Sequence, residues 1–207
     1  MARYTGAVCR LCRRSGEKLM LKGSKCITGC IQEKRSRPPG QIFRQRRRIS
    51  DYGIQLREKQ KARYTYGMME GQFRRTFAQA ERQPGITGQN LLVLLERRLD
   101  NVVYRLGFAD SRSQARQIVQ HGHIKLNGRK TNIPSCIVRE GDTINWKETS
   151  TKNEYCKQLA QSIKSKTVAS WLSLDTDNLA GKVLSLPTPD EVEVKLNGKA
   201  IVEFYSR

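Results

Sequence analysis

The sequence has few acidic residues for its length. Its 207 residues include only 19 Asp and Glu against 39 Lys and Arg, which gives a formal net charge of +20. A compact chain with this surplus repels itself unless a polyanion supplies the opposite charge. The composition therefore predicts a large anionic partner.

Long hydrophobic runs are also missing. The longest, residues 91–95, is far shorter than the roughly 20 residues that a membrane span needs. The first ten residues contain no apolar stretch of the kind a signal peptide requires. We therefore expect no membrane partner and a cytoplasmic location. In a reducing compartment, clustered cysteines more often bind metal than form disulfides.

No group of side chains has the pattern of a catalytic site. Asp100 and Asp110 border predicted helices, where ion pairing or capping explains them more simply than general-base chemistry. His121 and His123 lie in a turn interrupted by glycine, and such residues more often pack or form hydrogen bonds than bind metal. We expect neither an enzyme nor a small-molecule substrate.

The positive charge is concentrated at the amino-terminal end. Residues 1–50 contain fourteen basic and two acidic residues, a net charge of +12. The alternative to a binding segment is a solvated, disordered tail, which the interspersed cysteines and apolar residues make less favourable. The candidate residues of this segment for binding the anionic partner are Arg3, Arg10, Arg13, Arg14, Lys22, Arg35, Arg37, Arg44, Arg46, Arg47 and Arg48.

Four cysteines near the amino terminus have the spacing of a metal site. Cys9, Cys12, Cys26 and Cys30 form two close pairs, C-x2-C and C-x3-C, separated by thirteen residues. Two such turns can close a tetrahedral thiolate site, and Zn²⁺ suits it because it accepts soft sulfur ligands without redox chemistry. We predict one structural zinc ion; free structural thiols and an iron–sulfur cluster are the alternatives.

The two remaining cysteines have no partner at ligand spacing. We expect Cys136 to be a buried strand residue and Cys156 a helix residue.

A block of arginines follows the cysteines. Pro38, Pro39 and Gly40 predict an extended linker, and the arginines at 44 and 46–48 are candidate phosphate contacts. Their alternative is a solvent-facing helix entry. In that case the arginines would repel one another, because the block contains no acidic residue.

Residues 50–83 predict helical structure with a break near Gly67. Met69, Phe73, Phe77 and Ala80 share one face at helical spacing and are expected in the core. The tyrosines at positions 52, 64 and 66 could stack on bases, but packing is the more frequent role of such residues.

The next segment predicts two helices. The first begins at Thr87 and continues an apolar face to Gly107; the second, residues 112–120, begins with the capping box Ser111 and Gln114. Arg112 and Arg116 are four residues apart, so they share one face of the second helix.

An Asn-Gly hairpin follows at residues 123–134, and residues 136–146 repeat the strand–turn–strand pattern through Gly141. Residues 97–146 therefore predict two helices on a small antiparallel sheet. We expect the following basic residues on its outer surface: Arg97, Arg98, Arg112, Arg116, Lys125, Arg129 and Lys130.

The carboxyl-terminal part supplies apolar residues, beginning at Trp171 and Leu172, which we expect to pack on the helical part before residue 97. The predicted fold is α+β. A mainly helical first domain, residues 46–96, is completed by residues 167–207; a small basic module, residues 97–166, is inserted; and residues 1–45 form the zinc-bearing segment.

Several stretches closely resemble the S4 family of small-subunit ribosomal proteins, over nearly the whole chain. The most specific are SDYGIQLREKQKARYTYG from Ser50, NLLVLLERRLDNVVYRLGF from Asn90, SRSQARQIVQHGHIKLNGR from Ser111 and the terminal IVEFYSR. The middle part alone resembles a module that also occurs in RNA-modifying enzymes. The stretches on either side of this module favour the ribosomal protein family over the RNA-modifying enzymes.

The resemblance implies a structural protein that binds the 5′ domain of small-subunit (16S) rRNA early in assembly. It further implies contact with protein S5 and other small-subunit proteins, an influence on translational accuracy, and mRNA contacts near the entry channel by the arginines at 44 and 46–48. The resemblance leaves open whether the protein represses its own mRNA and whether it belongs to a bacterial or an organelle ribosome. A zinc-bearing DNA-binding regulator is the alternative from another class.

Overall fold

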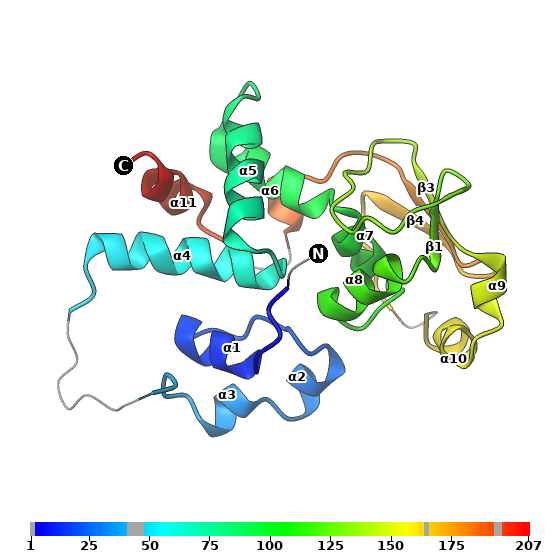
Figure 1. Cartoon of the computed structure of the whole chain (residues 1–207), viewed down its shortest axis with the longest axis horizontal. Helices are drawn as coiled ribbons and strands as arrows, with labels where there is room; N and C mark the ends of the chain where they lie inside the picture. Colours follow the sequence, from blue (N-terminus) through cyan, green and yellow to red (C-terminus); the bar gives the residue numbers. More distant parts are fainter. Residues whose placement is uncertain (1–2, 41–47, 164–165, 193–195) are drawn as a thin grey trace. The chain divides into compact units, whose positions relative to one another are not determined.

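The computed structural model describes residues 3–40, 48–163, 166–192 and 196–207. The chain forms two compact units. Figure 1 shows their helices and strands, coloured by position in the sequence. Unit 1 comprises residues 1–92 and 192–207, and unit 2 comprises residues 93–191. The chain therefore leaves unit 1 and returns to it at its carboxyl end.

Three short helices form the first part of unit 1. Gly16, with a φ of 78°, ends the first of them in a conformation that side chains rarely adopt. Leu19 is fully buried, and Lys61 of the next helix reaches Glu17 at 2.6 Å, so this segment is anchored on the helices that follow. The three helices are α1 (Cys9–Ser15), α2 (Ser24–Thr28) and α3 (Ile31–Lys34).

Longer helices make up the rest of unit 1, and the predicted break near Gly67 is confirmed. Ser50 caps the first by accepting a hydrogen bond from the Gly53 backbone N–H at 3.3 Å. Asn90 donates to the carbonyl oxygens of Gln83 and Pro84, which holds the turn between two of the helices. The helices are α4 (Asp51–Thr65), α5 (Glu70–Glu81), α6 (Thr87–Glu96), which continues into unit 2, and α11 (Gly198–Tyr205).

The carboxyl-terminal helix α11 completes the core of unit 1. It packs along α4 (Figure 1), and the Tyr205 ring lies 4.5 Å from the Phe77 ring. Phe73, Phe77 and Ala80 of α5 are buried as predicted. Met69 was wrongly assigned to this core, because it precedes the first turn of α5 and its side chain is exposed.

The three tyrosines of this region differ in their surroundings. Tyr66 is buried, which agrees with packing, whereas the ring of Tyr52 is half exposed and lies 5.6 Å from Phe204. Tyr64 is half buried, and its ring is covered by the guanidinium of Arg63 at 4.9 Å.

Unit 2 is a five-stranded antiparallel sheet packed with helices. Strand order is β2-β1-β3-β5-β4, so the last two strands of the unit extend the sheet beyond β3. The strands are β1 (Ile124–Leu126), β2 (Arg129–Lys130), β3 (Thr143–Trp146), β4 (Leu172–Asp175) and β5 (Ala180–Val183). The helices that begin within unit 2 are α7 (Leu99–Arg105), α8 (Arg112–Gln120), α9 (Glu148–Thr151) and α10 (Glu154–Ser162).

The first predicted hairpin is confirmed. Asn127 and Gly128 have φ values of 50° and 76°, the two positive values that a type I′ turn needs, and β1 pairs with β2 on either side. The second predicted hairpin is wrong. Within residues 136–146 only β3 is a strand, and Ile137 instead forms an isolated bridge with Arg98. Cys136 accordingly lies in a half-buried loop and not in a strand, while Cys156 is buried in α10 as expected.

The predicted continuous helix from Thr87 to Gly107 is divided in two. The chain turns at residues 97–98, where the backbone N–H of Val138 donates to the Arg97 carbonyl and that of Leu99 to the Cys136 carbonyl. The loop before β3 therefore supplies hydrogen-bond partners at the break, and the apolar periodicity continues through it into α7.

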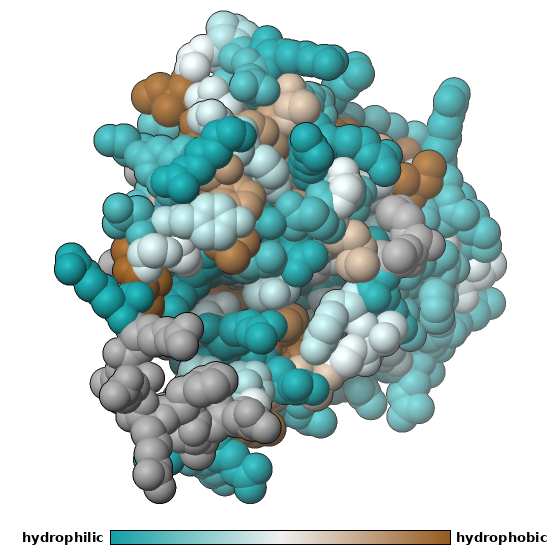
Figure 2. Space-filling model, turned by 60° about the vertical axis from the view of Figure 1, so that its left-hand side comes forward, coloured by the Kyte–Doolittle hydropathy of each residue, from teal (hydrophilic) through white to brown (hydrophobic). Residues whose placement is uncertain are grey.

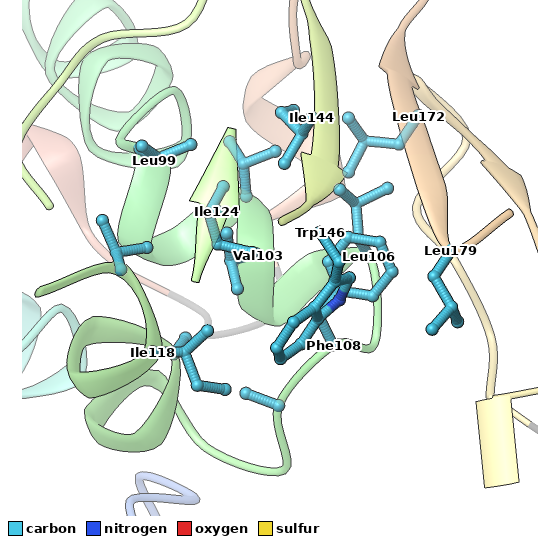
Figure 3. Packing of buried hydrophobic residues seen from close by; sticks show 14 of the residues in the cluster. Leu99, Val103, Leu106, Phe108, Ile118, Ile124, Ile144, Trp146, Leu172 and Leu179 are labelled. Carbon is cyan, nitrogen blue, oxygen red and sulfur yellow. The ribbon is translucent and has the colours of Figure 1, made fainter. Parts of the chain in front are cut away.

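Figure 3 shows the core of unit 2, where side chains from α7 and α8 meet those of the sheet. Trp171 and Leu172 belong to this core, so the prediction that residues 167–191 complete the helical domain is wrong; only residues 192–207 return to unit 1. The reason is strand pairing, because β5 satisfies its backbone groups on the edge of β3 and β4 in turn pairs with β5. In the described residues, no helix is long and apolar enough to cross a membrane.

Candidate RNA-binding surface and metal site

The four amino-terminal cysteines line one cavity of about 190 Å³. Cys9 and Cys12 lie one turn apart on α1, Cys26 lies on α2, and Cys30 immediately precedes α3. Cys12, Cys26 and Cys30 are buried and Cys9 is half buried. The spacing in sequence therefore brings all four thiols to one place.

The surroundings of the Cys12 thiol oppose its deprotonation when no cation is bound. Burial raises the pKa of the Cys12 thiol, a backbone hydrogen bond from Leu19 opposes this, and the charges of the other three thiols raise it further. Cys26 Sγ accepts a hydrogen bond from the Lys22 backbone N–H at 3.3 Å. A divalent cation would remove the mutual repulsion of four thiolates and would favour their deprotonation.

The donor set of four sulfurs therefore fits a structural zinc ion in its chemistry. Among the described residues, no three or more His, Cys, Asp or Glu side chains already form a metal-coordinating group. The four thiols share a cavity, and their closing around a metal stays a prediction.

Most of the predicted RNA-binding residues of the amino-terminal segment are exposed, and Figure 2 shows a largely hydrophilic surface on the face drawn there. Arg13 differs, because it is half buried and its Nε donates to the Arg37 carbonyl at 2.8 Å. Arg44, Arg46 and Arg47 lie outside the described residues. The exposed members are Arg3, Arg10, Arg14, Lys22, Arg35, Arg37 and Arg48.

Two arginines predicted on the outer surface of the module are buried. Arg98 forms a two-pronged ion pair with Asp100, with distances of 3.1 Å and 2.7 Å, and Arg116 reaches the same carboxylate at 3.2 Å. Arg98 and Arg116 are 2% and 5% exposed. Their assignment to the outer surface is therefore wrong.

The physical reason for this correction lies in α8. Arg112 and Arg116 do share one side of the helix, as their spacing predicts, but that side meets α7 and not solvent. Arg112 Nε donates to Asn101 Oδ1 at 2.8 Å, and its guanidinium lies over the Tyr104 ring at 4.5 Å. These contacts fix the orientation of the Arg112 side chain. The side chain is half exposed, so part of it still reaches the surface.

The other basic residues of the module differ in exposure. Arg97 is half buried, donates from Nε to the Val138 carbonyl at 3.0 Å, and has a pKa lowered by burial and by Arg139. Lys125 pairs with the exposed Glu148 at 2.9 Å. Arg129 and Lys130 are exposed on the β1–β2 hairpin. Among the basic residues predicted on the surface of the module, the two on this hairpin are therefore the most exposed to solvent.

His123 behaves as a packing residue, whereas His121 is exposed. His123 Nδ1 lies 2.9 Å from Ser150 Oγ, and its ring lies 6.3 Å from the Trp146 ring in a stacked orientation. Burial, with His121 and Lys147 nearby, lowers the pKa of His123.

The sequence-based prediction missed three exposed arginines on and directly after α5. Arg74 and Arg75 are exposed on the helix that buries Phe73 and Phe77, and the exposed Arg82 follows its last residue. The same helical period that identifies the apolar face also places these arginines on the opposite face, so the signal was available.

Comparison with known proteins places this arrangement in a family. Residues 3–96 match the model of the ribosomal protein S4/S9 N-terminal domain, and residues 97–144 match the S4 domain. The small ribosomal subunit protein uS4 of Dehalococcoides mccartyi is 56% identical over all 207 residues, and that of Heliobacterium modesticaldum is 55% identical over 208 aligned residues. Protein uS4A of Symbiobacterium thermophilum is 57% identical, and each of the three alignments covers 100% of both chains.

The chain belongs to the uS4 family.

This membership confirms the resemblance drawn from the sequence motifs, and the α+β fold with an S4 domain agrees with it. The uS4 family is one of ribosomal proteins and not of enzymes. The boundary between the two matched models, at residues 96 and 97, coincides with the turn between α6 and α7.

Proposed function

We propose that this protein is a structural component of the small ribosomal subunit that binds rRNA in the cytoplasmic ribosome and catalyses no reaction. The observation that carries the proposal is its full-length identity of more than half with small ribosomal subunit proteins. The net charge of +20 supports it, because folded RNA supplies the counter-charge that the isolated chain lacks.

The proposed binding mechanism is electrostatic capture followed by fit to the shape of folded RNA. Exposed arginines and lysines contact phosphates and set the orientation, while RNA junctions supply selectivity. Candidates with described, exposed side chains lie in two regions. They are Arg3, Arg10, Arg14, Lys22, Arg35, Arg37 and Arg48 in unit 1 and Arg129 and Lys130 on the hairpin.

The finer proposal follows from family membership. The protein binds the 5′ domain of 16S rRNA early in assembly, contacts protein S5 and other small-subunit proteins, and thereby influences translational accuracy. The basic block that ends in the exposed Arg48 contacts mRNA near its entry channel. We include in this proposal repression of its own mRNA through the same cationic surface.

We further propose one structural Zn²⁺ bound by Cys9, Cys12, Cys26 and Cys30. The shared cavity, the soft donor set and the hydrogen bond to Cys26 Sγ support it. The ion would cross-link the basic amino-terminal segment, which has few buried apolar residues of its own. Lys18 and Glu33, paired at 2.8 Å, are the protein's own link across the same segment.

The RNA-binding proposal is tested by measuring affinity for small-subunit rRNA as a function of salt. If about ten phosphates are contacted, the logarithm of affinity should fall against the logarithm of salt with a slope of about −7 to −9. A nearly flat dependence would contradict it. Tighter binding to duplex DNA would favour the regulator alternative, and turnover of RNA by the pure protein would favour an enzyme.

A further inference from the structure

The outer face of α5 is a continuous stripe that no other described element of unit 1 uses for its core. Its exposed residues follow the helical period, three and four positions apart. Phe73, Phe77 and Ala80 on the opposite face are buried, and Tyr205 packs on the two rings. The stripe is therefore held on a rigid helix. It consists of the exposed Gly71, Arg74, Arg75 and Gln79, the half-buried Ala78, and the exposed Arg82, which directly follows the end of α5.

The three arginines of this α5 stripe differ from the cations Lys59, Lys61 and Arg63 of α4, which are paired with acidic residues. Lys59 and Arg63 are neutralised by Glu70, and Lys61 by Glu17. Among the described residues, Arg74, Arg75 and Arg82 form no ion pair or side-chain hydrogen bond. Like charges that share a helix face destabilise it unless a counter-charge binds them.

Glu70 and Glu81 flank the stripe but do not neutralise it. Glu70 is already held by Lys59 at 2.8 Å and by the Tyr205 hydroxyl at 2.9 Å. Burial would raise the pKa of Glu70, but these hydrogen bonds lower it overall, so it is ionised and committed at neutral pH. Glu81, exposed at the end of the helix, makes no ion pair with the stripe in the described part of the chain.

The shape of the stripe permits close approach. A side chain added at Gly71 would meet nothing within 4 Å, and Ala78 contributes only a methyl group. Arg74 and Arg82 are eight residues apart, which corresponds to about 12 Å along the helix axis. Gly71 and Ala78 thus form a shallow centre of the stripe, with arginine side chains on either side. This shape suits a row of phosphates, because the guanidinium group of arginine binds phosphate oxygens in a fixed fork geometry.

We propose that the α5 stripe docks on the sugar–phosphate backbone of a double-helical RNA segment, with Arg74, Arg75 and Arg82 each contacting a phosphate. The inference rests on the proposed function and adds to it a contact surface outside the S4 domain. The wide, shallow minor groove of an RNA helix leaves its backbone accessible to such a flat face.

The charge of the stripe is tested with the variant R74A/R75A/R82A in the full-length protein. Three lost phosphate contacts should make the salt slope shallower by about 2 to 3 and lower rRNA affinity about 100-fold at 0.1 M salt. The matched control, K152A/K157A/K182A, removes three exposed lysines of unit 2 and should retain affinity within about threefold. Equal losses in both variants would overturn the inference.

The shape of the stripe is tested separately with the single variant Ala78→Gln. It keeps every charge and a good helix former but adds bulk at the shallow centre, so rRNA affinity should fall at least about tenfold. Backbone protection of the RNA against hydroxyl radicals should disappear over one contiguous helical stretch. Unchanged affinity and protection would overturn the inference, even if the triple variant fails to fold.

The two proposals fail in distinguishable ways. If the unmodified protein does not bind small-subunit rRNA, the proposed function and this inference are both overturned. If it binds and both stripe variants match the control in affinity, slope and thermal unfolding, only the α5 stripe is overturned.

Discussion

At the scale of single residues, Asp100 organises the start of unit 2. Its carboxylate accepts from both Arg98 and Arg116, and its Oδ1 also accepts from the Asn101 backbone N–H at 3.0 Å. Nearby, Glu96 pairs with Arg105 at 3.0 Å and accepts from Asn101. These charges are removed from water, so each depends on its partners being present.

We expect Asp100→Asn to destabilise unit 2 by about 3–5 kcal/mol, because two buried guanidinium groups lose their shared counter-charge. Urea unfolding followed by tryptophan fluorescence measures this, since both tryptophans, Trp146 and Trp171, lie in the core of unit 2. Asp177→Asn, in an exposed turn, is the control and should change stability by less than about 0.5 kcal/mol. Equal effects of the two substitutions would contradict the role of Asp100.

At the scale of elements, α6 and α11 meet through two glycines. A Cβ atom on Gly88 would lie 3.0 Å from the Gly198 carbonyl carbon, and one on Gly198 would lie 3.2 Å from Gly88. The neighbouring atoms are backbone atoms, which cannot move aside as a flexible side chain can. The close approach therefore sets how α11 packs in unit 1.

Gly88→Ala should lower stability by about 1–3 kcal/mol, although alanine is the better helix former. Gly71→Ala provides the matched control, because its added methyl meets nothing and should leave stability unchanged or raise it by up to about 1 kcal/mol. Thermal unfolding followed by far-ultraviolet circular dichroism compares them. A Gly88→Ala protein as stable as the Gly71→Ala protein would argue against the tight contact.

The amino-terminal helices are too short to be stable by themselves, since isolated helices under about 12 residues are marginal in water. We expect Cys9→Ser and Cys26→Ser to remove the bound zinc and to loosen about the first forty residues, while the S4 domain stays folded. Metal content and limited proteolysis measure the two effects, and Cys136→Ser is the control. Unchanged protease resistance of the amino-terminal segment after chelation would contradict the zinc proposal.

At the scale of the whole molecule, the two units have separate cores, and the boundary of unit 2 follows its sheet. Strands β4 and β5 and the buried Trp171 and Val183 lie beyond the end of the S4-domain match at residue 144. Gly181 of β5 lies so close to Leu106, which directly follows α7, that an added Cβ would come within 2.4 Å of its side chain. These strands are therefore an integral part of the packing of unit 2.

A fragment of residues 93–191 should accordingly unfold in one cooperative transition, with near-ultraviolet signals from packed tryptophans. A fragment of residues 97–166 lacks β4, β5 and Trp171, so it should show a broad, weak transition or none. Circular dichroism of both fragments under the same conditions measures this. A cooperative transition of the shorter fragment would contradict this expectation and would support the module boundary at residue 166 that the sequence pattern predicts.

The sequence by itself determined the features that depend on neighbouring residues. Helical period, capping residues and the Asn127–Gly128 turn act over a few positions, so α4, α5, α8 and the first hairpin could be predicted. The cysteine pairs are also local, and the chain brings both pairs to one cavity. The positive surplus and the family motifs are likewise properties of the sequence alone.

Only the tertiary structure decided which side of an element faces solvent and where distant strands pair. Arg116 lies on the predicted face of α8, but α7 and Asp100 cover that face. Residues 172–183 contain an apolar pattern that either unit could bury. They belong to unit 2 because β5 pairs with the edge of β3 and β4 pairs with β5. The physical reason is that periodicity fixes directions relative to one backbone, whereas burial and pairing depend on contacts between segments far apart in the chain.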